Sequence, residues 1–340
     1  MRDLLLMALQ GRPTPRRPVW LMRQAGRMLP EYRDLRARYS FEELTRDPEL
    51  AAEVTLMPVR RFPFDAAIVF ADLMSPVAAL GIEVEFAPGP VVSRPLRQAA
   101  DLRALRDPAP EQIAPEVIET LRLVTRELDG RIPVLGFAGG PWSIAAYLVQ
   151  GEGKRDFPAL RALAVSAPEL LEMLLAKLAS LCADYLVEQV RAGASAVQIF
   201  ETWSGLLSRR DWDRIVKPHL RTLLERVGAT GAPRILFLKD APHLVESALE
   251  LPAEALSVDW RVDLAELHAR VSPDRAVQGN LDPAILLGGP EITRQATRRL
   301  LRRVPSRGHV FNLGHGVLPD TPLASVEALI KVVHEEADNA

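Results

Sequence analysis

Two arginines near the start of the chain, Arg23 and Arg27, flank the short segment Gln24-Ala25-Gly26. On a helix the two cations would share a face and repel each other mildly. Such close placement beside a glycine therefore indicates that the pair holds an anion. A planar guanidinium group binds a carboxylate through two parallel hydrogen bonds, so a carboxylate is the anion that we expect.

The arginine pair belongs to a strongly basic segment. Residues 1–40 contain nine arginines against three acidic residues, a net charge of +6, although the whole chain carries a formal charge of −2. A solvated basic face and an anion-binding arm would both have this composition. The small overall charge gives no general attraction to nucleic acid or to an anionic membrane surface.

Polar residues also follow most of the short apolar segments of the chain. These positions are Asp72, Gly139-Gly140-Pro141, Glu201 with Thr202, Lys239 with Asp240, Asn280 with Asp282, and His315. An aspartate or threonine directly after a strand can simply cap the next helix. The Gly-Gly-Pro segment forms either a turn or a loop that cradles phosphate. His315 stands between two glycines, which let a ligand approach the backbone, and a purely structural role for it is equally open.

Several familiar catalytic signatures are absent from the sequence. It contains neither a P-loop nor a G-x-G-x-x-G segment, and neither H-E-x-x-H nor a G-x-S-x-G elbow. The single cysteine, Cys182, can form no internal disulfide and no multi-cysteine metal cage, and we expect it to be a small buried residue in a helix. A reducing cytosol fits this cysteine usage. We therefore expect no metal and no cofactor, and a chemistry that relies on electrostatics and acid–base groups.

Short segments rich in Val, Ile, Leu or Phe are the expected strands. They are Ala66–Phe70, Ile132–Phe137, Ala196–Phe200, Arg234–Leu238, Leu256–Trp260, Ala276–Gly279 and Val310–Leu313. None alternates cleanly between apolar and polar residues, which is typical of parallel strands covered on both faces. The segment Ile82–Phe86 is the candidate for an eighth strand.

Longer segments with apolar residues at helical spacing lie between these strands. They are Glu42–Arg61, Pro110–Leu128, Ala167–Ala192, Ser208–Val227, His243–Leu251 and Pro322–Glu336. Alternating strands and helices predict a parallel sheet, and this number of units favours a closed (β/α)8 TIM barrel with its site at the C-terminal strand ends. No flexible linker divides residues 1–340, so we expect one domain. We expect neither a signal peptide nor a membrane span.

Five segments, in order along the chain, resemble the uroporphyrinogen decarboxylase family. They are Pro18-Val19-Trp20-Leu21-Met22-Arg23-Gln24-Ala25-Gly26-Arg27, Arg60-Arg61-Phe62-Pro63-Phe64-Asp65-Ala66-Ala67-Ile68, Gly136-Phe137-Ala138-Gly139-Gly140-Pro141-Trp142, Gln278-Gly279-Asn280-Leu281-Asp282-Pro283 and Asn312-Leu313-Gly314-His315-Gly316. Together they cover nearly the whole chain. Two departures are a threonine at Thr202, where the family often has serine, and a segment Ala87-Pro88-Gly89-Pro90 that looks shorter than the usual loop.

The resemblance implies a cytoplasmic enzyme, usually a homodimer, with a (β/α)8 barrel and neither metal nor organic cofactor. The implied reaction is the decarboxylation of the four acetate groups of uroporphyrinogen III to coproporphyrinogen III, a step of tetrapyrrole and haem biosynthesis. The implied catalytic residues are Asp72, Arg23 and Arg27. The implied substrate-binding residues are Arg23, Gln24, Ala25, Gly26, Arg27, Asp72, Tyr147, Thr202 and His315. Phe137 matches a residue that lines the cleft.

The expected roles follow from the chemistry of an electron-rich ring system. Asp72 would accept hydrogen bonds from pyrrole N–H groups and offset a developing positive charge. Arg23 and Arg27 would bind substrate carboxylates. Two alternatives remain. One is a corrinoid- or thiol-dependent methyltransferase, which would need a zinc set with His and Cys ligands. The other is a non-catalytic tetrapyrrole-binding protein.

Overall fold

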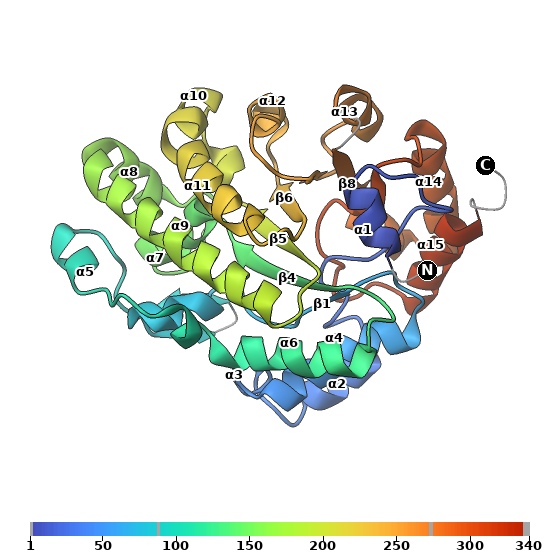
Figure 1. Cartoon of the computed structure of the whole chain (residues 1–340), viewed down its shortest axis with the longest axis horizontal. Coiled ribbons are helices and arrows are strands. Elements are labelled where there is room, and N and C mark those ends of the chain that lie inside the picture. The colour runs from blue at the N-terminus through green and yellow to red at the C-terminus, as the bar shows by residue number, and fades with distance from the viewer. Residues whose placement is uncertain (1–2, 87–88, 272–274, 336–340) are drawn as a thin grey trace.

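The centre of the protein is a curled parallel sheet of seven strands, seen in the computed structural model of residues 3–86, 89–271 and 275–335 (Figure 1). Neighbouring strands follow one another in the order β1-β4-β5-β6-β7-β8-β9. The strands are β1 (Ala67–Ile68), β4 (Val134–Gly139), β5 (Ala196–Glu201), β6 (Arg234–Leu238), β7 (Ala255–Val258), β8 (Ala276–Leu281) and β9 (His309–Leu313). All neighbours in this sheet pair in parallel, which confirms the predicted α/β class.

The residues of these strands are buried almost without exception, which explains their uninterrupted apolar character. The predicted bounds are close but not identical. β4 starts two residues after the predicted Ile132 and continues through Gly139. β7 begins at Ala255 and ends at Val258, before the predicted Trp260. The predicted and observed strand ends differ because the apolar pattern of the sequence shows where the centre of a strand lies. It does not show where the last backbone hydrogen bond forms.

The prediction of an eighth strand at Ile82–Phe86 was wrong. Val84–Phe86 is β2, and it pairs antiparallel with β3 (Pro90–Val92) in a separate two-stranded sheet. Half-buried residues on both strands suit such a surface hairpin. Of the predicted short loop between them, residues 87 and 88 lie outside the described residues, so its shape is not assessed.

The position between β9 and β1 is occupied by residues 18–20. Val19 forms a parallel bridge to Phe311 of β9, whose backbone N–H donates to the carbonyl of Pro18 over 2.9 Å. On the other side, the backbone N–H of Asp65 donates to the carbonyl of Val19 over 2.8 Å, just before β1. This short segment is too brief to show a strand pattern in the sequence. It leads directly to Arg23.

Helices connect the strands and cover the outside of the sheet (Figure 1). They are α1 (Leu4–Leu9), α2 (Pro30–Arg36), α3 (Phe41–Arg46), α4 (Pro48–Arg61), α5 (Ala99–Arg103), α6 (Pro115–Leu128), α7 (Pro141–Gln150), α8 (Pro158–Ser166), α9 (Pro168–Arg191), α10 (Arg209–Asp211), α11 (Lys217–Gly228), α12 (Val245–Ala248), α13 (Leu264–Arg270), α14 (Pro290–Arg303) and α15 (Leu323–Glu335). Short 3₁₀ segments include η1 (Ser75–Leu80), η2 (Pro110–Gln112), η3 (Ser204–Leu206), η5 (Pro242–Leu244) and η6 (Pro283–Gly288). Many helices begin with proline, whose fixed φ suits the first helical turn.

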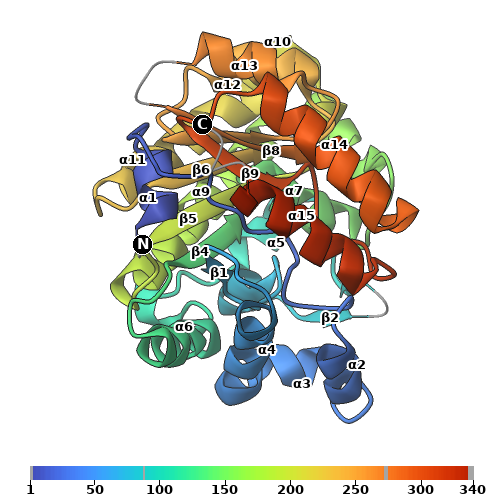
Figure 2. The same ribbon diagram turned by 90° about the vertical axis from the view of Figure 1, so that its right-hand side faces the viewer.

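The predicted helices are present, but several are divided. The segment 42–61 forms α3 and α4, because Asp47 caps a new helix whose first residue is Pro48. The segment 208–227 contains α10, a π-helical turn at Trp212–Val216 and α11. The segment 110–128 starts as η2 before α6, and the segment 243–251 holds only the short α12. The helices α14 and α15 lie side by side on the face seen in Figure 2.

The described helices include none that is long and apolar enough to cross a membrane. The longest, α9, spans 24 residues, and it packs against β4, α7 and α11. Its charged residues lie between buried leucines, as in other helices that cover a sheet.

A buried polar network crosses the inside of the curled sheet. The indole N–H of Trp20 donates to Oε1 of Gln278 over 3.0 Å, and Nε2 of Gln278 donates to Gln198 over 2.9 Å and to Ser257 over 3.0 Å. All four side chains are fully buried. Gln278 therefore ties the segment of residues 18–20 to β5, β7 and β8 beneath the strand ends.

Replacing Gln278 by leucine is expected to lower the free energy of unfolding by about 2–4 kcal/mol, because the volume is kept while several buried polar groups lose their partner. Denaturant unfolding followed by circular dichroism measures this change. The control is Gln295→Leu on the exposed face of α14, which should stay within about 0.5 kcal/mol of the wild type. Equal stabilities of the two variants would show that the network contributes little.

Candidate active site

The predicted site residues come together at the C-terminal edge of the parallel sheet. Asp72 follows β1, Thr202 follows β5, and His315 follows β9. Tyr147 lies on α7, which begins directly after β4, and Arg23 follows the segment that lies beside β9. Parallel strands bring all their carboxyl ends to one edge, so residues far apart in the sequence meet there.

Residues 22–27 form a series of turns and not a helix. Arg23 has a φ of 60° and Gly26 a φ of 152°, both outside the right-handed helical region. The backbone N–H of Met22 donates to Oδ1 of Asn312 over 3.0 Å, and its carbonyl accepts a hydrogen bond from the N–H of Val317 over 2.9 Å. The loop after β9 therefore fixes where the arginine turn lies.

The side chain of Gln24 points into the protein. It is fully buried, its Oε1 accepts a hydrogen bond from the N–H of Leu21 over 3.0 Å, and its Nε2 donates to the carbonyl of Ala66 over 2.9 Å. Its amide thus joins the arginine turn to the start of β1. Gln24 as a whole is fully buried here, and its contact with a ligand remains a prediction.

The side chain of Arg23 lies across Gly316, next to His315. A Cβ atom at position 316 would be only 2.4 Å from Cδ of Arg23 and 2.7 Å from its Cγ, so the glycine makes room for this arginine. Arg23 and Arg27 are both accessible to solvent. The surrounding protein atoms, followed by the charge of Arg27, lower the pKa of Arg23, which remains a strong cation at neutral pH.

Asp72 follows β1 and lies within electrostatic reach of Arg23. Its Oδ1 accepts a hydrogen bond from the N–H of Met74 over 2.8 Å, and its own N–H donates to Oγ of Ser75 over 3.3 Å. Burial raises the pKa of Asp72 to about 6, although N–H groups of Met74 and Leu73 and the charge of Arg23 oppose this. No ion pair within 4 Å joins Asp72 to Arg23 or Arg27 in the described residues. The opposite charges act on each other without touching.

Aromatic rings line the strand ends beneath these charges. Phe137, Phe200 and Phe237 come from β4, β5 and β6, and consecutive rings meet edge to face at 5.6 Å. The Phe237 ring meets the imidazole of His315 at 5.9 Å. Tyr147 stands beside this wall and contacts the ring of Trp203 at 6.5 Å. Phe137 and Phe237 are buried and Phe200 is half-buried, so these rings form an apolar layer at the strand ends that carry the charged residues.

His315 is a neutral donor or acceptor in this setting. Burial, followed by the positive charges of Arg23 and Lys239, lowers the pKa of His315 to about 4. Its Nδ1 accepts a hydrogen bond from the N–H of Gly316, which leaves Nε2 as the protonated nitrogen of the neutral ring. His315 can therefore donate a hydrogen bond to a carboxylate without carrying a charge.

Thr202 is positioned by a pair of residues that sequence reasoning did not assign to the site. Oγ of Ser143 accepts hydrogen bonds from the N–H of Thr202 over 2.7 Å and of Trp203 over 3.2 Å, and it donates to Oε1 of Glu201 over 2.5 Å. Glu201 is fully buried, and burial raises its pKa to about 7. An acidic residue at the end of a mostly apolar strand was the available signal.

The buried carboxyl of Glu201 predicts a pH-dependent stability. Its folded pKa is raised from 4.5 to about 7, so the protonated form is favoured by folding. The stabilisation is complete below about pH 4.5 and is lost as pH rises through 7, on the order of 3 kcal/mol. Glu201→Gln should remove this dependence, so the stability of the wild type relative to the variant falls between pH 5 and pH 8. Denaturant unfolding at several pH values tests this, and parallel curves would contradict it.

The residues that the structure describes contain no group of three or more His, Cys, Asp or Glu side chains arranged to hold a metal ion. Cys182 is fully buried in α9, as predicted, and burial raises its pKa well above the ordinary value for a thiol. It is therefore an unreactive thiol at neutral pH.

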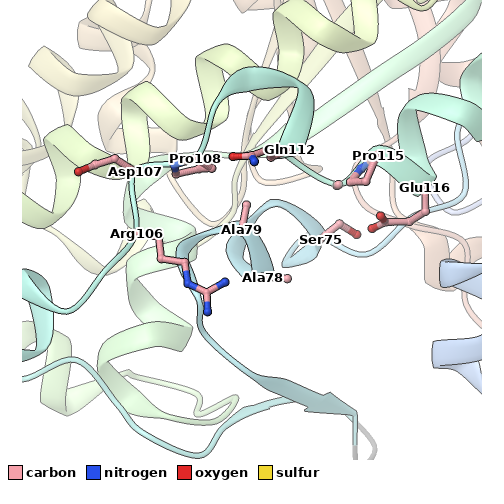
Figure 3. A pocket seen from close by; sticks show the side chains of 10 residues that line it. Ser75, Ala78, Ala79, Arg106, Asp107, Pro108, Gln112, Pro115 and Glu116 are labelled. Carbon is pink, nitrogen blue, oxygen red and sulfur yellow. The ribbon is translucent and has the colours of Figure 1, made fainter.

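A separate cavity of about 460 Å³ lies beside Ser75 of η1 (Figure 3). Its lining includes Ser75, Arg106 and Glu116. Ser75 is shared with the turn, because its hydroxyl accepts the N–H of Asp72. The cavity contains none of the predicted site residues.

The fold and the site together define a class: an α/β protein with a parallel curled sheet, whose strand ends present a carboxylate and two guanidinium groups above an aromatic wall. A family model described as uroporphyrinogen decarboxylase (URO-D) matches residues 1–336. The chain belongs to the uroporphyrinogen decarboxylase family. The family predicted from its motifs is thus confirmed, and with it the enzyme class, a carboxy-lyase.

Curated relatives agree with this assignment. The chain is 46% identical over 328 residues to the uroporphyrinogen decarboxylase of Syntrophotalea carbinolica, which covers 96% of both chains. It is 42% identical over 335 residues to that of Geobacter metallireducens, covering 98% of both chains. A solved structure described as a methyltransferase from Methanosarcina mazei has a TM-score of 0.81 over 98% of both chains at 21% identity, a likeness of fold alone.

Proposed function

We propose that this chain removes the carboxyl groups of the four acetate side chains of uroporphyrinogen III as CO₂ and releases coproporphyrinogen III. The observation that carries the proposal is the arrangement of Asp72 and Arg23, which are electrostatically coupled but not joined by an ion pair. A polycarboxylate ring placed between them would offer N–H groups to the aspartate and carboxylates to the arginine.

The reaction itself requires no added cofactor, because the substrate can serve as its own electron sink. Protonation of a pyrrole ring on carbon gives an iminium cation. The bond between the acetate methylene and its carboxylate then breaks, CO₂ leaves, and the electron pair flows into the ring. A proton is then delivered to the methylene, which becomes a methyl group, and the ring carbon releases the proton that it gained in the first step, which restores the pyrrole. Stabilising the cationic ring is therefore the main task of the protein.

Asp72 is the residue proposed for that task. It must be ionised to offset the positive charge, and its pKa of about 6 in the free protein makes it mostly ionised at neutral pH. Pyrrole N–H groups donating to its free carboxylate positions would lower that pKa further. One anion near the ring contributes about 3–4 kcal/mol by analogy with single oxyanion-hole donors, so the other groups of the cleft must supply the rest.

The other predicted residues would hold the acidic rim of the substrate. Arg23 and Arg27 are proposed to bind acetate or propionate carboxylates, and Tyr147, Thr202 and His315 to hydrogen-bond others. The aromatic wall of Phe137, Phe200 and Phe237 would support the face of the ring. The neutral state of His315 makes it a hydrogen-bond donor to a carboxylate.

We further propose that the sheet is a closed (β/α)8 barrel within one domain, with residues 18–20 as its eighth strand. The hydrogen bonds of this segment to Phe311 and Asp65 support the closure. A homodimer in the cytoplasm is proposed on the family membership. A thiol-dependent methyltransferase is less well supported, because the single cysteine is buried in α9 and not at the strand ends.

The decisive experiment is incubation of the purified protein with uroporphyrinogen III in the dark under reducing conditions. Oxidation of the products and chromatography should then reveal stepwise loss of carboxyl groups down to the product with four carboxylates. A control incubation uses protein unfolded by heat. Tight binding of the substrate with no CO₂ released would instead indicate a tetrapyrrole-binding protein, and it would refute the proposed activity.

A further inference from the structure

Lys239 is a cation at the strand ends that none of the roles described so far uses. It follows β6 directly and is largely buried, with 19% of its side chain exposed. Its Nζ lies 5.4 Å from the centre of the Trp203 ring, on the loop that also carries Thr202. Lys239 thus lies between the C-terminal ends of β5 and β6.

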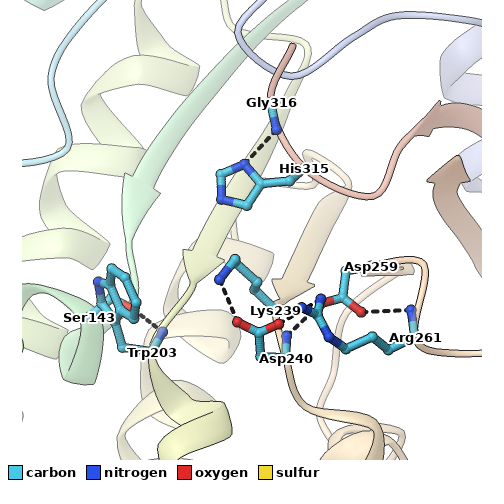
Figure 4. A network of polar contacts seen from close by, with 8 residues as sticks. All are labelled: Ser143, Trp203, Lys239, Asp240, Asp259, Arg261, His315 and Gly316. Carbon is cyan, nitrogen blue, oxygen red and sulfur yellow. Dashed lines mark hydrogen bonds and ion pairs between the residues drawn. The ribbon is translucent and has the colours of Figure 1, made fainter. Parts of the chain in front are cut away.

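Lys239 and Arg23 both act on the same histidine. Arg23 packs against Gly316, the residue after His315, and the charges of Arg23 and Lys239 both lower the pKa of His315. The edge-to-face contact of His315 with Phe237, two residues before Lys239, places the histidine against β6. Figure 4 shows the imidazole of His315 and the amine of Lys239 on the same side of the strand ends. A carboxylate beside His315 would therefore meet cations from two directions.

A chain of alternating charges holds Lys239 from behind. Its Nζ donates to Oδ2 of Asp240, whose Oδ1 lies 2.6 Å from Arg261. Arg261 also donates to Oδ2 of the buried Asp259 over 3.0 Å, and the N–H of Asp240 donates to the same oxygen over 2.6 Å (Figure 4). The two carboxylates, Asp240 and Asp259, are thus balanced by the two cations Lys239 and Arg261. Lys239 is the first member of this series of ion pairs.

This order of charges allows Lys239 to change partners. If the ammonium group turns towards a substrate carboxylate, Asp240 keeps Arg261 as its counter-ion and is not left unpaired. The side chain of Asp240 is also 40% exposed, so water can replace the contact that Lys239 gives up. The backbone of Asp240 is also fixed, because Gly205 packs against its carbonyl so closely that a Cβ at 205 would lie at 2.4 Å. The backbone of Asp240 is therefore held in place, while the long side chain of Lys239 can rotate.

We propose that Lys239 binds a carboxylate of the substrate beside His315, as a third cation in addition to Arg23 and Arg27. The proposal rests on the proposed function, since it names a further contact with the same polycarboxylate ring. Its role is substrate binding and not bond breaking, so its loss should raise KM more than it lowers kcat.

The test compares Lys239→Met with wild type, using uroporphyrinogen III as substrate. We expect KM to rise about 10-fold, the loss of one charged hydrogen bond, and to depend less steeply on salt. Lys239→Arg should recover most of the affinity, because a guanidinium group also binds carboxylates. Thermal unfolding of each variant shows whether the fold is intact.

The matched control is Lys217→Met. Lys217 is 13% exposed and is also paired with acids, Asp213 and Glu250, but Glu250 precedes β7 and lies towards the opposite end of the strands. The KM of the Lys217→Met variant should stay within about twofold of the wild-type value. If Lys239→Met shows the same small change while wild type turns over normally, the lysine is structural and this inference fails alone. Absence of wild-type turnover would instead refute the proposed function.

Discussion

Asp72→Asn is expected to lower turnover by about 100-fold or more while the fold stays intact, since a preorganised charge at the reacting centre is lost. Asparagine keeps an oxygen that can accept the N–H of Met74, so the turn before η1 should persist. What disappears is the negative charge that faces the ring. Product chromatography after a fixed time gives the rate.

The stability of this variant should change in the opposite direction. The folded pKa of Asp72 is raised from 3.8 to about 6, so its ionisation reduces stability as pH rises through 6. Removing the charge should therefore increase the free energy of unfolding at pH 7.5, on the order of 1–3 kcal/mol. Lower activity with equal or higher stability separates a catalytic role from a structural one. A variant that is both inactive and less stable would point to the turn instead.

The pH profile supplies a second readout for the same residue. If the free enzyme needs ionised Asp72, kcat/KM of the wild type should fall about tenfold for each pH unit below about 6. Asp72→Asn should lose this decline. The matched control is Asp47→Asn, because Oδ1 of Asp47 likewise accepts the N–H two residues later, at the exposed start of α4. Its turnover should equal that of wild type.

Arg23→Met is expected to lower kcat/KM about 100-fold, because a guanidinium–carboxylate contact in a partly enclosed cleft contributes about 2–3 kcal/mol. The effect should appear mainly in KM if Arg23 only binds, and in kcat as well if it orients the reacting acetate. Steady-state kinetics with uroporphyrinogen III distinguish the two. Arg12→Met, from the same basic segment, is the control. Arg12 follows Gly11, whose carbonyl accepts a hydrogen bond from Nε of Arg307. Arg307 precedes β9 and therefore lies at the opposite end of the strands.

The position of Arg23 can be tested without removing its charge. Gly316→Ala would place a methyl group 2.4 Å from Cδ of Arg23, so the arginine must move. A loss of affinity in this variant would show that the precise place of the guanidinium group matters. Full activity of both Arg23→Met and Gly316→Ala would remove the arginine from the site.

The strands were predictable because their short apolar runs are almost wholly buried and are separated by longer helical segments. The helix α7 was not predicted because it is apolar nearly all round, so its residues show no helical periodicity. The division between α3 and α4 was missed although Pro48 marks it, because the apolar spacing continues across the break. The segment of residues 18–20 forms its bridge through backbone groups alone, which leave no pattern of side chains.

From the sequence, only the site residues that lie in or near recognisable motifs could be predicted. Asp72 and His315 follow β1 and β9, and Tyr147 lies on α7 directly after β4, so all three lie on the edge that parallel strands share. The inward direction of the Gln24 amide depends on partners 3 and 42 residues away, which no local pattern reveals. The same holds for Ser143 and Glu201, which are 58 residues apart in sequence. Placing Thr202 through them requires the tertiary structure.

The pairing of Met22 with Asn312 has a consequence for biosynthesis. These residues are separated by 290 positions, so at ordinary elongation rates the ribosome adds the second roughly 15 to 60 seconds after the first. Until then Trp20 and Leu21 have no partner from β9, and the guanidinium groups have no fixed orientation. A nascent chain is therefore unable to bind a polycarboxylate substrate until β9 has been synthesised.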